Sequence, residues 1–254
     1  MAYEGAYQDI NARVLTGWIE EGWEWGKPIE HAAYERALAG EWEILLTPTK
    51  PVPRAWFGRL EGARVLGPAS GGAQQMPILT AAGAQCTVLD YTTAQLDAER
   101  LVAEREGYRI DIVQADMTRP LPFADASFDL VVNPVSVCYV REVEPIWREV
   151  ARVLRPGGTF LTGFDLPICF AVDDDECQLV NRIPFDPVAN PALLEELEAT
   201  DSGVQFSHGL EETLGGLLRT GFAICDLYED TTGTEGNLQD LNIPAFLAVQ
   251  ALKR

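Results

Sequence analysis

The chain has 254 residues, 47% of them hydrophobic, which is enough for one large α/β domain or for a domain with a cap. Its formal net charge is -20, a sign that repels phosphate backbones and excludes DNA or bulk RNA as a substrate. The sequence has no bilayer-length apolar run and no secretory signal at its start, so no membrane partner is expected.

Residues 1–62 are predicted to form a separate helical cap region ahead of the main domain. Helices are expected at 11–21 and at 29–39, the second one ended by Gly40. Indoles at the density found here usually anchor packing, but some could line the mouth of a pocket. The region contains five of the six tryptophans: Trp18, Trp23, Trp25, Trp42 and Trp56.

The stretch 63–90 has the pattern of a βαβ nucleotide-binding unit. A short apolar strand at 64–66 leads into a turn of small residues, then into a helix at 76–82 and a second strand that ends on Asp90. Small residues let the backbone approach a ligand closely, and the amides at a helix start can face it. A carboxylate at the end of the second strand can accept hydrogen bonds from both ribose hydroxyls. The unit therefore predicts a nucleoside site, although an ordinary packed βα turn is the alternative.

The alternation of strands and helices then continues along the chain. Thr92 and Gln95 have the spacing of a capping box at the start of a helix that Gly107 ends. Strands are expected at 110–113, 128–132 and 159–164, with a helix at about 145–154 before the last of them. This rhythm predicts an α/β fold with a doubly wound, Rossmann-like parallel sheet.

The rhythm lapses at 165–207, where we expect a lid-like insertion, and returns with a helix through 210–218 and strands at 222–227 and 245–249. The acidic run 173–176 is predicted to be a solvated loop rather than a metal site, and no metal is expected. The five cysteines are odd in number and lack a CxxC pattern, which favours reduced core thiols and a cytoplasmic protein.

With these elements in place, residues 63–254 resemble the class I S-adenosylmethionine (SAM)-dependent methyltransferases of the methyltransferase type 11 kind, here with a Trp-rich leader. Besides the glycine turn, three segments carry the resemblance: QADM at 114–117, LPFADASFDLVV at 121–132 and REVARVLRPGGTFL at 148–161. The resemblance implies a seven-stranded sheet, mostly parallel with the last strand antiparallel. It also implies SAM as the methyl donor, with S-adenosylhomocysteine as the product, and supports this cofactor much more than any particular acceptor. The preferred function is transfer of the methyl group to a small molecule.

The resemblance assigns cofactor roles to individual residues. Asp90 would hold the ribose, Tyr91 and Met117 would flank the adenine, and Asp116 would accept from the adenine amino group. Asn133 and Pro134 would border the sulfonium and the acceptor. The full set of expected cofactor-binding residues is Gly67, Ala69, Ser70, Gly71, Gly72, Gln75, Asp90, Tyr91, Gln95, Asp116, Met117, Asn133 and Pro134.

The chain departs from the family pattern at the turn. Gly67 stands where the family usually has an acid that contacts the SAM amino group, and Ala69 and Ala73 replace two of the usual glycines. Gln74 and Gln75 could replace the lost contact.

The sequence does not settle the catalytic residues. Asp165, Tyr139 and His208 are possible general bases, although a lone histidine at a helix start is more often a cap or a satisfied surface residue. Arg141 and Arg148 could meet an anionic substrate or simply be solvated helix residues.

Two alternative functions are kept. One is a nicotinamide dehydrogenase, with Gly67, Ala69 and Gly72 as a degenerate GxGxxG. The other is a SAM-binding protein without transferase activity, such as a sensor or an assembly partner. The oligomeric state cannot be inferred.

Overall fold

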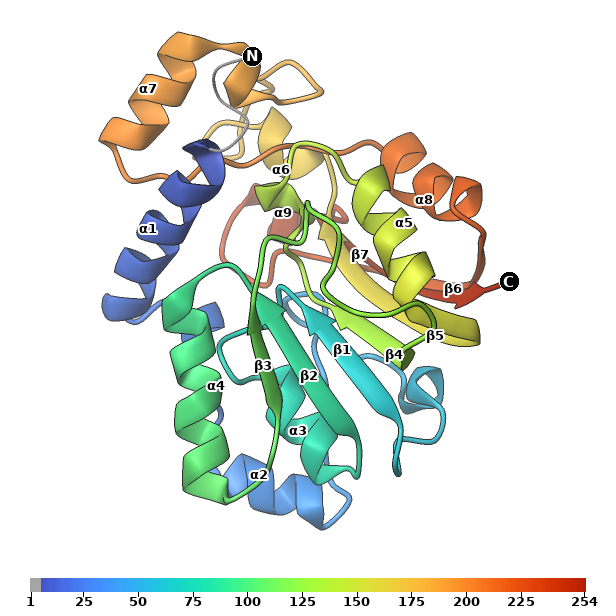
Figure 1. The fold of residues 1–254 in the computed structure, drawn as a ribbon. Coiled ribbons are helices and arrows are strands. Elements are labelled where there is room, and N and C mark those ends of the chain that lie inside the picture. The colour runs from blue at the N-terminus through green and yellow to red at the C-terminus, as the bar shows by residue number, and fades with distance from the viewer. Residues whose placement is uncertain (1–5) are drawn as a thin grey trace.

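A seven-stranded sheet forms the centre of the molecule, seen in the computed structural model that describes residues 6–254 (Figure 1). Its strand order is β3-β2-β1-β4-β5-β7-β6. The first five strands are parallel, and β7 lies antiparallel between β5 and β6. This confirms the predicted doubly wound sheet. The strands are β1 (Arg64–Pro68), β2 (Gln85–Asp90), β3 (Asp111–Gln114), β4 (Phe128–Asn133), β5 (Leu154–Asp165), β6 (Phe222–Asp230) and β7 (Phe246–Lys253).

Helices cover both faces of the sheet, because its side chains alternate between two apolar clusters. Val65 and Leu130 belong to the cluster with α3 (Gln75–Ala81) and α4 (Thr93–Glu106). Their neighbours Leu66 and Val131 belong to the other cluster, with Trp147 of α5 (Glu144–Val153) and Leu217 of α8 (Leu210–Arg219). Both sets are fully buried, as expected for central parallel strands.

The RPGG break at 155–158 differs from its expected form. These residues belong to β5, whose pairing with β4 jumps from Phe128↔Leu154 to Leu130↔Thr159. Gly157 has a φ of 73°, a left-handed conformation that suits glycine, so the chain bulges out here and rejoins the sheet.

The described part of the N-terminal region, residues 6–62, divides into two parts. α2 (His31–Leu38) packs beside α3, whereas the 3₁₀ turn η2 (Arg54–Phe57) contacts β5, and its Trp56 is buried in the same cluster as Val65. Trp42 packs edge-on against Phe57. In contrast, α1 (Ala6–Glu20) lies away from this face, near the carboxyl ends of the strands (Figure 1).

The insertion after β5 lies next to α1. It contains α6 (Ile168–Ala171), the turn η4 (Pro187–Ala189) and α7 (Pro191–Ala199). Leu194, Val204 and Phe206 form an apolar cluster with Tyr7 and Ile10 of α1. α1 and the insertion thus make one layer over the carboxyl ends of the strands. The remaining short elements are η1 (Glu24–Gly26), η3 (Val137–Tyr139) and α9 (Asn237–Asp240).

The acidic run and the cysteines have ordinary structural surroundings. Asp173 accepts hydrogen bonds from the N–H groups of Cys177 and Gln178, and Glu176 accepts one from Leu238. All five cysteines are free thiols, but Cys177 and Cys225 are exposed, so the expectation of core thiols is wrong for these two. Within residues 6–254, no helix is long and apolar enough to cross a bilayer.

Candidate functional site

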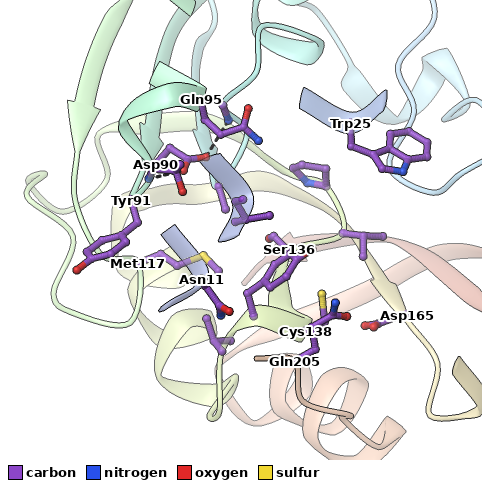
Figure 2. A pocket seen from close by; sticks show the side chains of 18 of the residues that line it. Asn11, Trp25, Asp90, Tyr91, Gln95, Met117, Ser136, Cys138, Asp165 and Gln205 are labelled. Carbon is purple, nitrogen blue, oxygen red and sulfur yellow. Dashed lines mark hydrogen bonds between the residues drawn. The ribbon is translucent and has the colours of Figure 1, made fainter. Parts of the chain in front are cut away.

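A pocket of about 550 Å³ opens at the carboxyl ends of β1, β2, β4 and β5 and is covered by α1 (Figure 2). From the β1–β4 pair the strands follow one another in opposite directions, β1 to β3 on one side and β4 to β5 on the other. Ligands of open α/β sheets bind at such a switch point. Nine of the expected cofactor residues line the pocket: Ala69, Gly71, Gln75, Asp90, Tyr91, Gln95, Asp116, Met117 and Pro134.

The turn after β1 keeps a glycine-like backbone despite its substitutions. Ala69 and Ala73 have φ values of 47° and 56°, in the left-handed region that costs an alanine about 1 kcal/mol. Ala73 N–H donates to the buried Glu99 of α4 at 2.8 Å, which helps to hold this conformation. At Gly71 a Cβ would lie 2.6 Å from Gln95 Cβ and 2.8 Å from Asp90 Oδ2, so only glycine fits there.

Gly67 cannot carry the acid that the family pattern usually has at this place. A Cβ on Gly67 would lie 2.7 Å from Sδ of Met76, which is fully buried. Gln75, next to Met76, lines the pocket, and its Nε2 reaches Leu45 O at 3.4 Å. Gln74 also lines the pocket, but its Nε2 donates to the carbonyls of Glu24 and Lys27 and so holds the N-terminal segment against the turn.

Asp90 lies at the end of β2 and lines the pocket although it is only 9% exposed. Its Oδ2 accepts from Gly71 N at 3.1 Å, and its Oδ1 accepts from Thr92 N at 2.9 Å. Burial raises the pKa of this carboxyl to about 6, against the lowering effect of these hydrogen bonds. Asp90 is therefore ionised at pH 8 and still has lone pairs for a ligand.

Gln95 does not form the predicted capping box, and that prediction is wrong. The backbone N–H of Thr92 is already taken by Asp90, and the Gln95 side chain turns over the glycine turn, where its Oε1 would lie 2.7 Å from a Cβ on Gly72. Within residues 6–254 this buried Oε1 has no hydrogen-bond partner. An orphaned acceptor on a pocket wall is a sign of a missing ligand donor.

The expected adenine residues surround the next part of the pocket. Asp116 Oδ1 accepts from the N–H and the hydroxyl of Thr118, which fixes the loop after β3. Met117 is buried, and Tyr91 is 37% exposed, with its hydroxyl donating to Asp9 of α1.

Four expected cofactor residues lie behind the pocket wall rather than on it: Gly67, Ser70, Gly72 and Asn133. Ser70 donates to Val132 O at 3.0 Å. Asn133 is 1% exposed and donates to Pro68 O and to Ser136 Oγ, both at 2.8 Å, while Thr162 donates to its Oδ1. The amide of Asn133 thus links β1, β4 and β5, and both its Nδ2 and its Oδ1 already have hydrogen-bond partners within the protein.

The three possible bases differ in position. Asp165 and Tyr139 line the pocket. His208 lies outside the lining, and its buried Nε2 contacts the carbonyls of Val137 at 3.1 Å and Val140 at 2.8 Å. It therefore donates to the backbone around η3 and supports that turn from behind.

The charges on the pocket wall are all negative. Among the described residues that line it, the acidic side chains are Asp90, Asp116 and Asp165, and none is Lys, Arg or His. Arg141 instead pairs with Asp186, and Arg148 with Glu144. The wall does not suit an anionic ligand.

Part of the lining was not expected from the sequence. Trp18, Trp23 and Trp25 do line the pocket, as some indoles were expected to, but Gln8, Asn11, the 45–48 segment and Gln205 were not anticipated. They come from segments far apart in the chain, and no local pattern marks them.

Asn11 holds α1 in place over the pocket. Its Nδ2 donates to Val204 O at 2.9 Å, and its Oδ1 accepts from Val204 N. The N–H and the carbonyl of Val204 are buried, so Asn11→Ala should leave them unpaired and weaken the docking of α1 by about 1–3 kcal/mol. We expect about 5- to 150-fold faster hydrogen exchange in a peptide covering 6–20.

The matched control is Arg13→Ala on the same helix, because the Arg13–Asp201 ion pair is exposed and contributes little. Equal exchange in the two variants would show that the Asn11–Val204 pair does not hold the helix.

Comparison with known proteins identifies the family. A methyltransferase domain family matches residues 66–162. The uncharacterized methyltransferase YbaJ of Bacillus subtilis is 38% identical over 250 residues, which cover 96% of this chain and 97% of that protein. The similarity therefore includes α1 and the insertion as well as the sheet.

Solved structures show the same fold. A SAM-dependent methyltransferase from Mesorhizobium loti has a TM-score of 0.63 at 25% identity, covering 79% of this chain and 95% of its own. The 1,6-didemethyltoxoflavin-N1-methyltransferase of Burkholderia thailandensis, solved with 1,6-didemethyltoxoflavin and S-adenosylhomocysteine, has a TM-score of 0.63 at 16% identity, covering 100% and 91%. The chain belongs to the SAM-dependent methyltransferases and uses SAM as its cofactor.

Proposed function

We propose that this pocket binds SAM along the β1–β2 side and transfers its methyl group to a small molecule bound on the β5 side. The observation that carries the proposal is the pairing of Asp90 with the close-packed turn at Gly71. Together they place an acceptor carboxylate beside a tight turn on the wall of the pocket. The orphaned Oε1 of Gln95 on the same wall supports a ligand with donor groups.

The cofactor residues are assigned roles within this proposal. Asp90 holds the ribose hydroxyls, Asp116 accepts from the adenine amino group, and Tyr91 and Met117 flank the ring. SAM supplies an activated methyl group when bound. The contribution of the protein is to hold donor and acceptor in line and to exclude water, effects that reach about 7–11 kcal/mol in well-oriented reactions.

A small acceptor fits the enclosure better than a macromolecule. α1 and the insertion lie over the pocket, and Asn11 joins them by two buried hydrogen bonds. The volume of about 550 Å³ is typical of small-ligand sites. The net charge of -20 disfavours nucleic acid.

Gln75 is proposed to replace the missing acid as the contact to the SAM amino group. Gln75→Ala should weaken binding of S-adenosylhomocysteine about tenfold, because one hydrogen bond to a charged group is lost. Gln75→Glu should bind at least as well as the wild type, since it restores a carboxylate. Calorimetry measures both, and equal affinity in all three proteins would remove Gln75 from the site.

The proposed function itself is tested in two steps. The protein is first titrated with S-adenosylhomocysteine, with NAD as a parallel titrant, and is then incubated with methyl-labelled SAM and a panel of neutral metabolites. Saturable binding of the first ligand and labelled product support a methyltransferase acting on small molecules. If protein or RNA were labelled and none of the metabolites were, the proposed small-molecule acceptor would be wrong.

A further inference from the structure

The end of the pocket farthest from Asp90 has a distinct chemical character. In Figure 2, Asp165 and Cys138 lie on one side of the pocket, and Asp90 and Tyr91 lie on the other. Asp165 is the last residue of β5 and is only 6% exposed, yet it lines the pocket. Within residues 6–254, no side chain forms a hydrogen bond or an ion pair with its carboxylate, and its one hydrogen-bonding partner is its own backbone.

The residues around this carboxylate are mostly apolar or aromatic, and the polar Ser136 and Gln205 lie on the same side of the pocket (Figure 2). Phe246 of β7 is the direct antiparallel partner of Asp165, so the two side chains stand on the same face of the sheet. Tyr139 and Cys138 of η3, and Cys169 and Phe170 of α6, complete this end of the pocket. Aromatic side chains from β7, η3 and α6 thus contribute to this end, and aromatic walls suit a planar ligand.

We propose that this end is the acceptor subsite, and that it binds a neutral aromatic or heteroaromatic molecule whose N–H or O–H donates to the carboxylate of Asp165. The inference rests on the proposed function, because it assigns the second half of the same pocket. A buried carboxylate without a partner is costly, and a ligand donor supplies the hydrogen bond it lacks. The absence of a lining cation among the described residues excludes anionic acceptors.

The titratable groups facing Asp165 support the assignment. Burial raises the pKa values of Cys138 and Tyr139 well above their usual range, and that of Cys169 to about 12, so all three stay neutral. Burial raises the pKa of Asp165 to about 7, so a large fraction is ionised at neutral pH. Asp165 is then the group at this end able to take up a proton. The proton leaves the acceptor N–H or O–H, whose electron pair stays on that atom, and binds a carboxylate oxygen of Asp165.

The test uses ligand binding rather than turnover. The protein is saturated with S-adenosylhomocysteine and titrated with indole, with 1-benzothiophene, which has the same shape without the N–H, and with indole-2-carboxylate, which adds a negative charge. We expect indole to bind at least tenfold more tightly than either of the others. Equal binding of indole and benzothiophene, or binding of none of the three, would overturn the proposal.

Variants locate the effect at Asp165. Asp165→Leu should remove the preference for indole, and Asp165→Asn, which keeps an acceptor without the charge, should retain part of it. Asp97→Asn, an exposed residue on α4, controls for loss of one negative charge. S-adenosylhomocysteine affinity is measured first in every protein. If the wild type does not bind S-adenosylhomocysteine, the proposed function is wrong. If it binds S-adenosylhomocysteine but does not prefer indole, only the acceptor subsite is wrong.

Discussion

Asp90→Ala is expected to weaken binding of S-adenosylhomocysteine at least 100-fold, measured by calorimetry at pH 8. Each hydrogen bond from a ribose hydroxyl to an ionised carboxylate contributes about 1.5–3 kcal/mol, and two such bonds are lost. The substitution also frees the N–H groups of Gly71 and Thr92, which loosens the turn. Asp90→Asn keeps one carbonyl acceptor and should lose less, about tenfold.

Asp97→Ala is the matched control for Asp90. It removes an aspartate from the first turns of α4, but Asp97 is exposed and pairs only with Arg100 at the surface of the described chain. Its affinity should equal that of the wild type. Undiminished binding by Asp90→Ala would move the ribose away from β2 and undo the cofactor assignment for this side of the pocket.

The cofactor-free wild type is expected to lose stability between pH 6 and pH 8.5. The substitution Glu99→Gln should remove much of this loss. Glu99 is fully buried, and burial raises the pKa of its carboxyl to about 8, opposed by the hydrogen bond from Ala73. Between pH 5 and 8 the folded protein therefore keeps a proton that the unfolded chain has released, so stability falls as pH rises.

The size of the Glu99 effect follows from the same linkage. Over this interval the wild type should lose about 2 kcal/mol more than Glu99→Gln, or about 5 °C in melting temperature. Asp90 and Asp165 change stability in the same direction in both proteins, so the difference reports Glu99 together with its interaction with Asp90. Glu104→Gln, an exposed change on the same helix, should follow the wild type. Parallel pH curves for Glu99→Gln and wild type would mean that Glu99 is already ionised when folded.

The sheet and its nucleotide-binding unit could be predicted because their signals are local. β1, the small-residue turn, α3, β2 and Asp90 follow one another within 27 residues, so spacing alone places the acid at the strand end. The sequence pattern did not show whether the Gln95 side chain caps α4 or lies over the glycine turn, because the spacing of Thr92 and Gln95 also fits a capping box. The hydrogen bond that excludes the box, from Thr92 N–H to Asp90 Oδ1, spans only two residues, but the spacing of Thr92 and Gln95 does not show that the Asp90 side chain takes this N–H.

The cover of the pocket could not be predicted for the opposite reason. Asn11 and Val204 are 193 residues apart, and no sequence pattern links an amide on one helix to a loop backbone that distant. His208 shows the same limit. Its position at a helix start allowed a catalytic role, whereas the fold turns its ring toward the η3 carbonyls.

The position of β7 has a consequence for how the chain acquires its structure during synthesis. β6 pairs only with β7 within the described sheet, and β7 follows it in sequence but lies between it and β5. As the ribosome releases β6, this strand has no neighbour, and the backbone N–H and C=O groups on the edge of β5 that will pair with β7 remain in water. The sheet closes only when residues 246–253 emerge and insert, so the nascent protein passes through a state with two unpaired strand edges exposed to aggregation and chaperones.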